Sequence, residues 1–263
     1  MRILIVFAIL YFALIFLSLG IGAYYIIEKL ELGDPFEVIN RYVLYYLGFD
    51  IVFRYLLQPM PVANVQPLLY QPIEKKTIVH FSLLKMLYSF FNWSHLLLLV
   101  PLGIILVVEG AQGVETFLWA TSLYLLLLAN NYLNVLVNQK ISFFIAVATL
   151  VVGMAALQYF EYFDLTQYTQ PLFLALYHQP FSVVLVFILT LVTYYLSFNH
   201  FVGKMYLDTG LAKKSEKTIA IDGKYFERLG KRGLILRNDF ALIIRNKRAR
   251  MAVFAGFFFI FYG

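Results

Sequence analysis

The fold class of this chain follows from one stretch near its start, ILIVFAILYFALIFLSLGIGAYYII at residues 3–27. The stretch is 25 residues long and carries no charge. At 1.5 Å per helical residue it spans roughly 38 Å, enough for a tilted crossing of a bilayer. It is too long for the apolar region of a signal peptide, and no A-x-A cleavage site precedes Glu28 and Lys29. We therefore expect a retained transmembrane helix at the start of the chain.

Composition extends this expectation to the whole chain. Hydrophobic residues make up 62% of the sequence and charged residues only 14%, with a mean hydropathy of +0.77, which is far from the usual balance of soluble domains. Aromatic residues that favour the headgroup zone stand near the ends of apolar stretches, at Tyr24, Tyr25, Tyr45, Tyr46, Trp93 and Tyr159. The sequence has no cysteine, which excludes disulfides, thiolate metal ligands and cysteine nucleophiles.

Apolar stretches predict six complete membrane spans, at residues 3–27, 41–58, 77–108, 116–137, 141–160 and 181–201. A seventh begins at residue 251, but the stretch from there to the last residue holds only 13 residues, too few to cross a bilayer. We predict an all-α polytopic transmembrane helix bundle that looks cut short. Its expected parts are a six-helix half at 1–202, a basic linker at 203–233, an amphipathic helix at 234–250 and a truncated span at 251–263.

Charges between the spans alternate in a way that predicts orientation. Acidic loops follow the first, third and fifth spans, with Glu28, Glu31, Asp34, Glu37, Glu109, Glu115, Glu161 and Asp164. Basic residues follow the second and fourth, with Lys75, Lys76 and Lys140. Residues 203–250 hold 13 Lys and Arg against five acidic residues, a net charge of +8. Because basic segments stay on the cytoplasmic side of a membrane, we place the amino terminus in the cytoplasm. In a chain with six spans, this positive-inside rule explains the basic excess better than a nucleic-acid-binding patch does, so we expect no nucleic-acid partner.

The second span contains charged residues where a bilayer disfavours them. Glu37 with Arg41, and Asp50 with Arg54, stand four residues apart on successive helical turns. With Arg41 at the outer surface, Asp50 lies roughly 13 Å deeper, where an ionised side chain costs about 2.5–3.5 kcal/mol. Two interpretations stay open: a polar site that faces a translocation path, or a helix-packing pair that snorkels towards the membrane surface, which is the simpler of the two.

Polar residues also recur in the third and fourth spans. One set, spaced by three or four residues along a single expected helix, comprises Ser82, Lys85, Ser89, Asn92 and His95. The other closes the fourth span with Asn130, Asn131, Asn134 and Asn138, of which the first, third and fourth stack. Hydrogen bonding between helices explains both sets, and contact with a substrate is the alternative. From the second and third spans we take Asp50, Arg54, Lys85, Asn92 and His95 as the candidate intramembrane polar site.

The sequence offers no recognised catalytic or metal motif. The histidines His80, His95, His178 and His200 are scattered and lack the spacing of a helix-borne metal site. No G-x-S-x-G motif occurs, and no Gly-Lys pair completes a P-loop. We therefore expect no catalytic residue, no metal and no cofactor in this chain.

Two segments next to the spans resemble parts of known transporters. Between the second and third spans, PLLYQPIEKK at residues 67–76 combines apolar and basic residues. LRNDFALIIRNKRAR at 236–250 is amphipathic and leads into the last apolar stretch. With YLDTGL at 206–211, these stretches are similar to bacterial ABC-2-type permeases, and more closely to an uncharacterised multi-pass bacterial family of permease-like architecture. Residues 67–76 resemble its first cytoplasmic coupling segment, and 236–250 its elbow helix.

The resemblance implies a permease subunit of an ATP-driven exporter in the bacterial inner membrane. A separate ATPase would bind ATP and dock in trans on the coupling segment, whose implied contact residues are Leu68, Leu69, Gln71, Pro72, Ile73, Glu74, Lys75 and Lys76. The implied elbow residues are Arg237, Phe240, Arg245, Lys247 and Arg248. The other expected partners are the lipid bilayer and a missing second half or a second permease copy.

Two other classes of function stay open. One is a membrane-embedded enzyme that modifies lipids, with Asp50, Lys85 and His95 converging in a cavity. The other is a non-catalytic scaffold in which the polar residues serve only helix packing. The transported substrate and the direction of transport have no signature in the sequence.

Overall fold

The computed structural model describes residues 2–58, 72–138 and 141–204, and the single residues 233, 236, 238 and 239. Its elements are, in order, α1 (Arg2–Lys29), α2 (Pro35–Leu57), α3 (Lys75–Leu87), α4 (Phe90–Val108), α5 (Gly113–Val137), α6 (Ile141–Tyr159), α7 (Thr166–His178) and α8 (Ser182–Lys204). All regular elements in these ranges are helices, which confirms the all-α prediction. Apart from those single residues, the predicted basic linker after 204, the elbow helix and the truncated span lie outside this description. The same holds for the implied site residues Leu68, Leu69, Gln71, Arg237, Phe240, Arg245, Lys247 and Arg248.

Five helical stretches within the described ranges are long and apolar enough to cross a membrane. They are Leu10–Lys29 of α1, Lys75–Val108 across α3 and α4, Gly113–Val137 of α5, Ser142–Tyr159 of α6 and Ser182–Gly203 of α8. Their length and composition indicate a membrane protein. The second predicted span, at residues 41–58, corresponds to α2, which is long enough but holds Arg41, Asp50 and Arg54 and is therefore not among the five.

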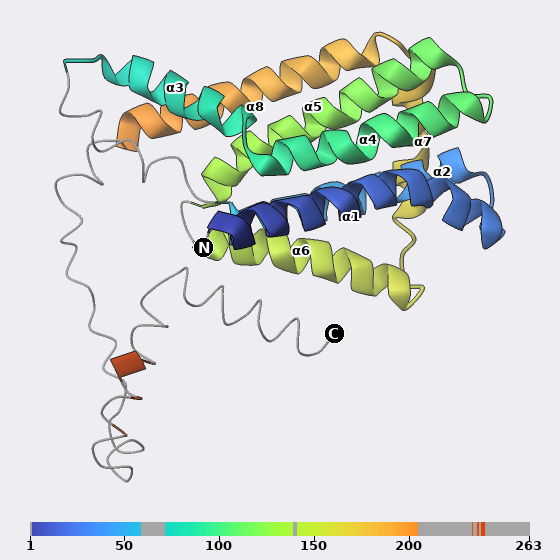
Figure 1. Cartoon of the computed structure of the whole chain (residues 1–263), viewed down its shortest axis with the longest axis horizontal. Helices are drawn as coiled ribbons and strands as arrows, with labels where there is room; N and C mark the ends of the chain where they lie inside the picture. Colours follow the sequence, from blue (N-terminus) through green and yellow to red (C-terminus); the bar gives the residue numbers. More distant parts are fainter. Residues whose placement is uncertain are drawn as a thin grey trace. The chain divides into compact units, whose positions relative to one another are not determined.

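The ends of the helices separate acidic loops from basic ones. Figure 1 shows the α1–α2 loop, the α4–α5 loop and the segment between α6 and α7 at one end of the bundle, while the start of α3 and the end of α5 lie at the other. The first three connections are the acidic ones, and Lys75 and Lys76 stand at the start of α3. The arrangement thus groups the loops as the charges predict, and which end faces the cytoplasm stays a prediction.

The predicted span at 77–108 falls within one apolar stretch, Lys75–Val108, but its helix is not continuous, because it breaks at Tyr88 and Ser89. Tyr88 ends α3, and Ser89 is the N-cap of α4, with its hydroxyl oxygen accepting a hydrogen bond from the backbone N–H of Phe91 at 3.2 Å. A serine at this position satisfies an N–H that a new helix leaves free. Pro101 stands inside α4 and does not end it.

The helix α7 was not predicted from the sequence. It is 13 residues long, contains Pro171, and lies between two predicted spans. Its side chains pack onto α2: the hydroxyl of Thr169 donates to the carbonyl of Arg41 at 2.7 Å, and Phe173 is buried in the core. Tertiary packing therefore holds a helix too short to be stable alone.

The helix α5 packs against α2, α3, α4, α6 and α7. The buried apolar core of α2, α4, α5 and α7 consists of Val43, Leu99, Leu102, Leu106, Trp119, Leu123, Leu127 and Phe173. The helix α1 lies along α4, and a Cβ placed on Gly20 would collide with the backbone carbonyl of Leu98. Glycine therefore permits the close approach of these two helices.

Candidate functional site

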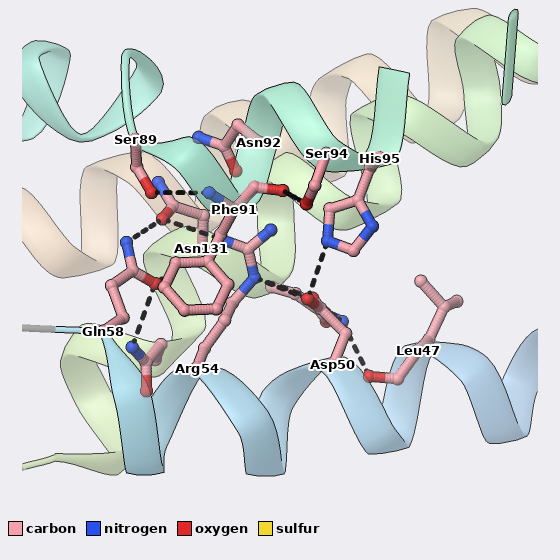
Figure 2. A network of polar contacts seen from close by, with 12 residues as sticks. Leu47, Asp50, Arg54, Gln58, Ser89, Phe91, Asn92, Ser94, His95 and Asn131 are labelled. Carbon is pink, nitrogen blue, oxygen red and sulfur yellow. Dashed lines mark hydrogen bonds and ion pairs between the residues drawn. The ribbon is translucent and has the colours of Figure 1, made fainter. Parts of the chain in front are cut away.

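One face of α2 and its C-cap residue carry polar side chains at intervals of four residues: Tyr46, Asp50 and Arg54 on the helix and Gln58 at the cap. This spacing places them one above the other along the helix. The face lies against α5 and is hydrogen-bonded to His95 of α4, and Figure 2 shows Asp50, Arg54 and Gln58 rising from α2 towards His95, Asn92 and Asn131. Arg54 has no exposed surface and Asp50 is 5% exposed, so the charges are inside the helix bundle.

The carboxylate of Asp50 is the centre of the network. The Nε of Arg54 lies 2.8 Å from both carboxylate oxygens, and the Nε2 of His95 lies 2.9 Å from Oδ1. Asn130 of α5 adds a donor, with its Nδ2 at 3.2 Å from Oδ2 and 2.9 Å from the carbonyl of Leu47. Three helices therefore share one buried carboxylate.

The guanidinium of Arg54 extends the network along α5. Its Nη1 donates to the side-chain oxygen of Asn131 at 3.1 Å and to Gln58 at 3.4 Å. Gln58 in turn donates to the same oxygen of Asn131 at 2.8 Å, and Asn134 donates to Gln58 at 3.4 Å. These bonds bring the end of α2 together with the last turns of α5.

His95 has partners at both ring nitrogens. Its Nδ1 is hydrogen-bonded to the hydroxyl of Tyr46, and its Nε2 faces Asp50. The rings of Phe16 on α1 and Tyr46 on α2 meet the imidazole edge to face, with centroids 5.7 Å and 5.6 Å away. The imidazole is 3% exposed and has aromatic neighbours on two sides.

Three buried polar atoms in the described residues have no hydrogen-bond partner: Arg54 Nη2, Asn92 Oδ1 and Asn131 Nδ2. Asn92 uses its Nδ2 to bind the carbonyls of Met86 and Leu87 at 3.0 Å and 3.3 Å, which ties the end of α3 to α4. Each orphaned buried atom costs about 1–3 kcal/mol. Their occurrence in one region is typical of a site that is not optimised for stability alone.

The structure unites part of the predicted intramembrane site. Asp50, Arg54 and His95 are directly bonded, and Asn92 lies beside them in Figure 2. Lys85 is exposed on α3 and does not belong to the buried cluster. Because the helix breaks after α3, the predicted polar face from Ser82 to His95 is not one continuous helix face.

Two further expectations about charged residues are corrected. The Asp50–Arg54 pair does not snorkel, because both side chains are buried between helices. Glu37 and Arg41 do not pair with each other directly: Arg41 donates to Gln170 of α7 at 3.2 Å, and Gln170 donates to Glu37 at 3.1 Å. The amide of α7 therefore joins the two charges.

Sequence reasoning missed Tyr46 and Gln58, and it left Asn131 out of the asparagine stack. The four-residue spacing that linked Asp50 with Arg54 continues to Tyr46 on one side and Gln58 on the other, so this signal was present in the sequence. Nothing comparable indicated Asn131, because its role depends on how α5 is rotated against α2.

The described part of the predicted coupling segment lies at the surface. Pro72, Ile73, Glu74 and Lys76 are exposed and Lys75 is half-buried.

In the described residues no group of three or more His, Asp or Glu side chains is arranged to hold a metal ion.

Comparison with known proteins identifies the family of this chain. A model described as a family of unknown function, DUF5687, matches residues 1–263, so the chain belongs to that family. No curated protein and no solved structure matches the chain. The family and the apolar helices together agree with the expected uncharacterised membrane family.

Proposed function

We propose that this member of the DUF5687 family is the permease subunit of an ATP-driven exporter in the bacterial inner membrane, oriented with its amino terminus in the cytoplasm. A separate ATPase docks on the coupling segment at residues 67–76, and six spans form one half of the translocation unit. The single observation that supports this most is the position of α3, which runs from the exposed end of that segment to Asn92, beside the buried polar network.

The helix α3 is suited to transmit movement. At its start, Glu74 and Lys76 are exposed, whereas Ile78, Val79 and Leu83 on the same helix are buried by 98% or more. A rigid helix with one exposed end and one packed face moves as a unit when its end is displaced. The far end is bound to the side chain of Asn92, next to the network.

The buried network supports transport over a purely structural bundle. An ion pair and an imidazole inside a helix bundle are expensive in a bilayer, and such residues mark substrate or ion pathways in membrane proteins. The network joins α2, α4 and α5. The helix α3 contacts α5 and is bound to α4 through Asn92, so a shift of α3 that moves either helix changes the network. We infer that this region rearranges when the ATPase closes.

The test is co-purification of the full-length protein from membranes, followed by an ATPase assay of the eluate. The native chain is compared with the double variant Lys75→Glu and Lys76→Glu, and with Lys76→Glu alone. Lys85→Glu is the matched control, because Lys85 is an exposed lysine on the same helix. A co-purifying ATPase that is lost in the double variant and retained in the control supports the proposal. An ATPase-free eluate from the native protein contradicts it.

A further inference from the structure

We propose that Tyr46, His95 and Asp50 form a proton-binding site inside the helix bundle, and that uptake of one proton by His95 changes the packing of α2 against α4. The ligand is the proton itself. The inference needs no ATPase, so it stands or falls independently of the function proposed above.

Geometry fixes how the neutral imidazole is held. The Nε2 of His95 lies 2.9 Å from a carboxylate oxygen of Asp50, which can only accept, so Nε2 carries the hydrogen. Nδ1 then has a free electron pair, and the hydroxyl of Tyr46 donates to it. One imidazole tautomer is selected by two partners on α2, as expected for a histidine whose protonation state matters.

Few charged groups face this imidazole. From α2 the neighbours are Tyr46, Asp50 and Arg54; α1 presents the ring of Phe16, and α5 presents the neutral amide of Asn130. With His95 neutral, the carboxylate and the guanidinium sum to a net charge of zero.

Protonation changes that balance by one unit. The incoming proton binds Nδ1, the ring becomes an imidazolium, and the Tyr46 hydroxyl turns from donor to acceptor. No covalent bond breaks, and the net charge of the site rises from zero to +1. Asp50 then faces two cations, and the repulsion between His95 and Arg54 is weakly screened in the interior. This favours movement of Arg54 away from the imidazole, towards Asn131 and Gln58, which it already contacts.

Stability alone does not explain this arrangement. Apolar side chains would pack between α2 and α4 in a bilayer without the cost of buried charges. Arg54 already neutralises Asp50, so the imidazole adds a titratable group that charge balance does not need. The unpaired Nη2 of Arg54 shows that the guanidinium is not fully satisfied in this state, which leaves it donors for a second arrangement.

The first measurement is the protonation state of His95 in the full chain, reconstituted in lipid nanodiscs with ¹⁵N-labelled histidine rings. The sequence has only four histidines, so His→Gln variants at the other three positions assign the His95 signals. We expect the Nε2–H tautomer at pH 8.5 and a reversible conversion to the doubly protonated ring by pH 5. Asp50→Asn should alter this conversion, because it removes the carboxylate that faces Nε2. His178, which is exposed on α7, is the control and should not respond to Asp50→Asn.

The second measurement tests the change in packing. Because the sequence has no cysteine, spin labels can be placed at Phe49→Cys on α2 and Val100→Cys on α4, both at exposed positions. We expect their distance distribution to differ between pH 8.5 and pH 5 in the native background and to be constant in His95→Gln. A control pair at Phe117→Cys on α5 and Leu150→Cys on α6, also exposed, should not change.

Three outcomes overturn the proposal. One is a His95 ring that stays in a single protonation state from pH 8.5 to pH 5. The second is titration of His95 with unchanged distances between α2 and α4. The third is a pH-dependent distance change that persists in His95→Gln.

Discussion

The helices α5 and α6 are both apolar enough to cross a bilayer, yet they occupy opposite environments. In the span of α5 half of the residues are buried inside the protein, whereas in the span of α6 none are. The buried positions of α5 include Thr116, Ser122, Asn130, Asn131 and Asn134. The described surface of α6 is instead apolar, with Ile145, Leu150 and Val152 all more than half exposed.

The difference in burial between α5 and α6 follows from the lipid environment of the bundle. In water an apolar helix face must be covered, but in lipid it can remain at the surface without cost, and the polar groups are the ones that need partners. The interior of this bundle is therefore marked by polarity, and its periphery by apolar exposure. A functional site is expected where α2, α4 and α5 meet, and α6 is expected to tolerate change.

The largest expected effect comes from breaking the buried ion pair. Arg54→Met removes the guanidinium and leaves the carboxylate of Asp50 with fewer donors, which should cost about 3–5 kcal/mol of stability. Thermal unfolding in detergent, followed by size-exclusion chromatography after heating, measures the loss. Leu150→Met on α6 is the control and should have almost no effect, because Leu150 is 64% exposed.

A smaller loss of stability for Arg54→Met than for Leu150→Met would contradict the contrast between the polar interior of the bundle and its apolar periphery. The double variant Asp50→Leu with Arg54→Met sharpens it, because removing both charges together avoids an unpaired buried carboxylate. We expect the double variant to be more stable than Arg54→Met alone.

Removing an apolar side chain tests packing in the two helices. Leu127→Ala in α5 deletes a side chain that is 1% exposed and leaves a cavity, which should cost about 2–3 kcal/mol. Leu150→Ala in α6 exchanges one lipid-facing side chain for another and should change the melting temperature little. Equal losses in both variants would mean that α6 is covered by a further part of the assembly.

Much of the fold could be predicted from the sequence, because the solvent imposes it. Apolar length alone gave the helices at 3–27, 116–137, 141–160 and 181–201, close to α1, α5, α6 and α8. The break at Ser89 was harder to predict, since the apolar run continues across it and only the capping hydroxyl indicates a new start. The helix α7 was not predicted because it is short and contains Pro171, and its stability comes from contacts with α2.

The candidate site was predictable within one helix and not between helices. The four-residue spacing of Asp50 and Arg54 is a local property, and it gave their ion pair correctly. The bond between His95 and Asp50 depends on the rotation of α4 against α2, which spacing does not contain. Lys85 was grouped with His95 by assuming one unbroken helix, and the turn at Tyr88 and Ser89 removes that relation.

A smaller effect is expected at the contact between α1 and α4. Gly20→Ala introduces a Cβ that would collide with the backbone carbonyl of Leu98, so the helices must separate, at a cost of about 1–3 kcal/mol. Gly22→Ala on the same helix is the matched control, because its Cβ would meet only the end of the Ile26 side chain at 3.5 Å. Melting temperatures of the two variants compare them directly. Equal values would mean that α1 does not lie closely against α4.

The smallest expected effect lies where the peripheral helix α6 leads into the packed helix α7. The hydroxyl and the backbone N–H of Thr166 donate to Asp164, and the hydroxyl bond is the main reason why the pKa of this carboxyl is lower than usual. A lowered carboxyl pKa means that its stabilising effect is present at neutral pH and is lost as the pH falls through that value, below about 4. Asp164→Ala should therefore speed hydrogen exchange in the first turn of α7 at pH 7 and leave α6 unchanged, whereas Asp164→Asn, which keeps an acceptor, should change it less. On acidification the native chain should lose protection from hydrogen exchange in this turn, until its exchange rate approaches that of Asp164→Ala. Equal exchange rates of the native chain and Asp164→Ala at pH 7 would show that the bond does not hold α7 in place.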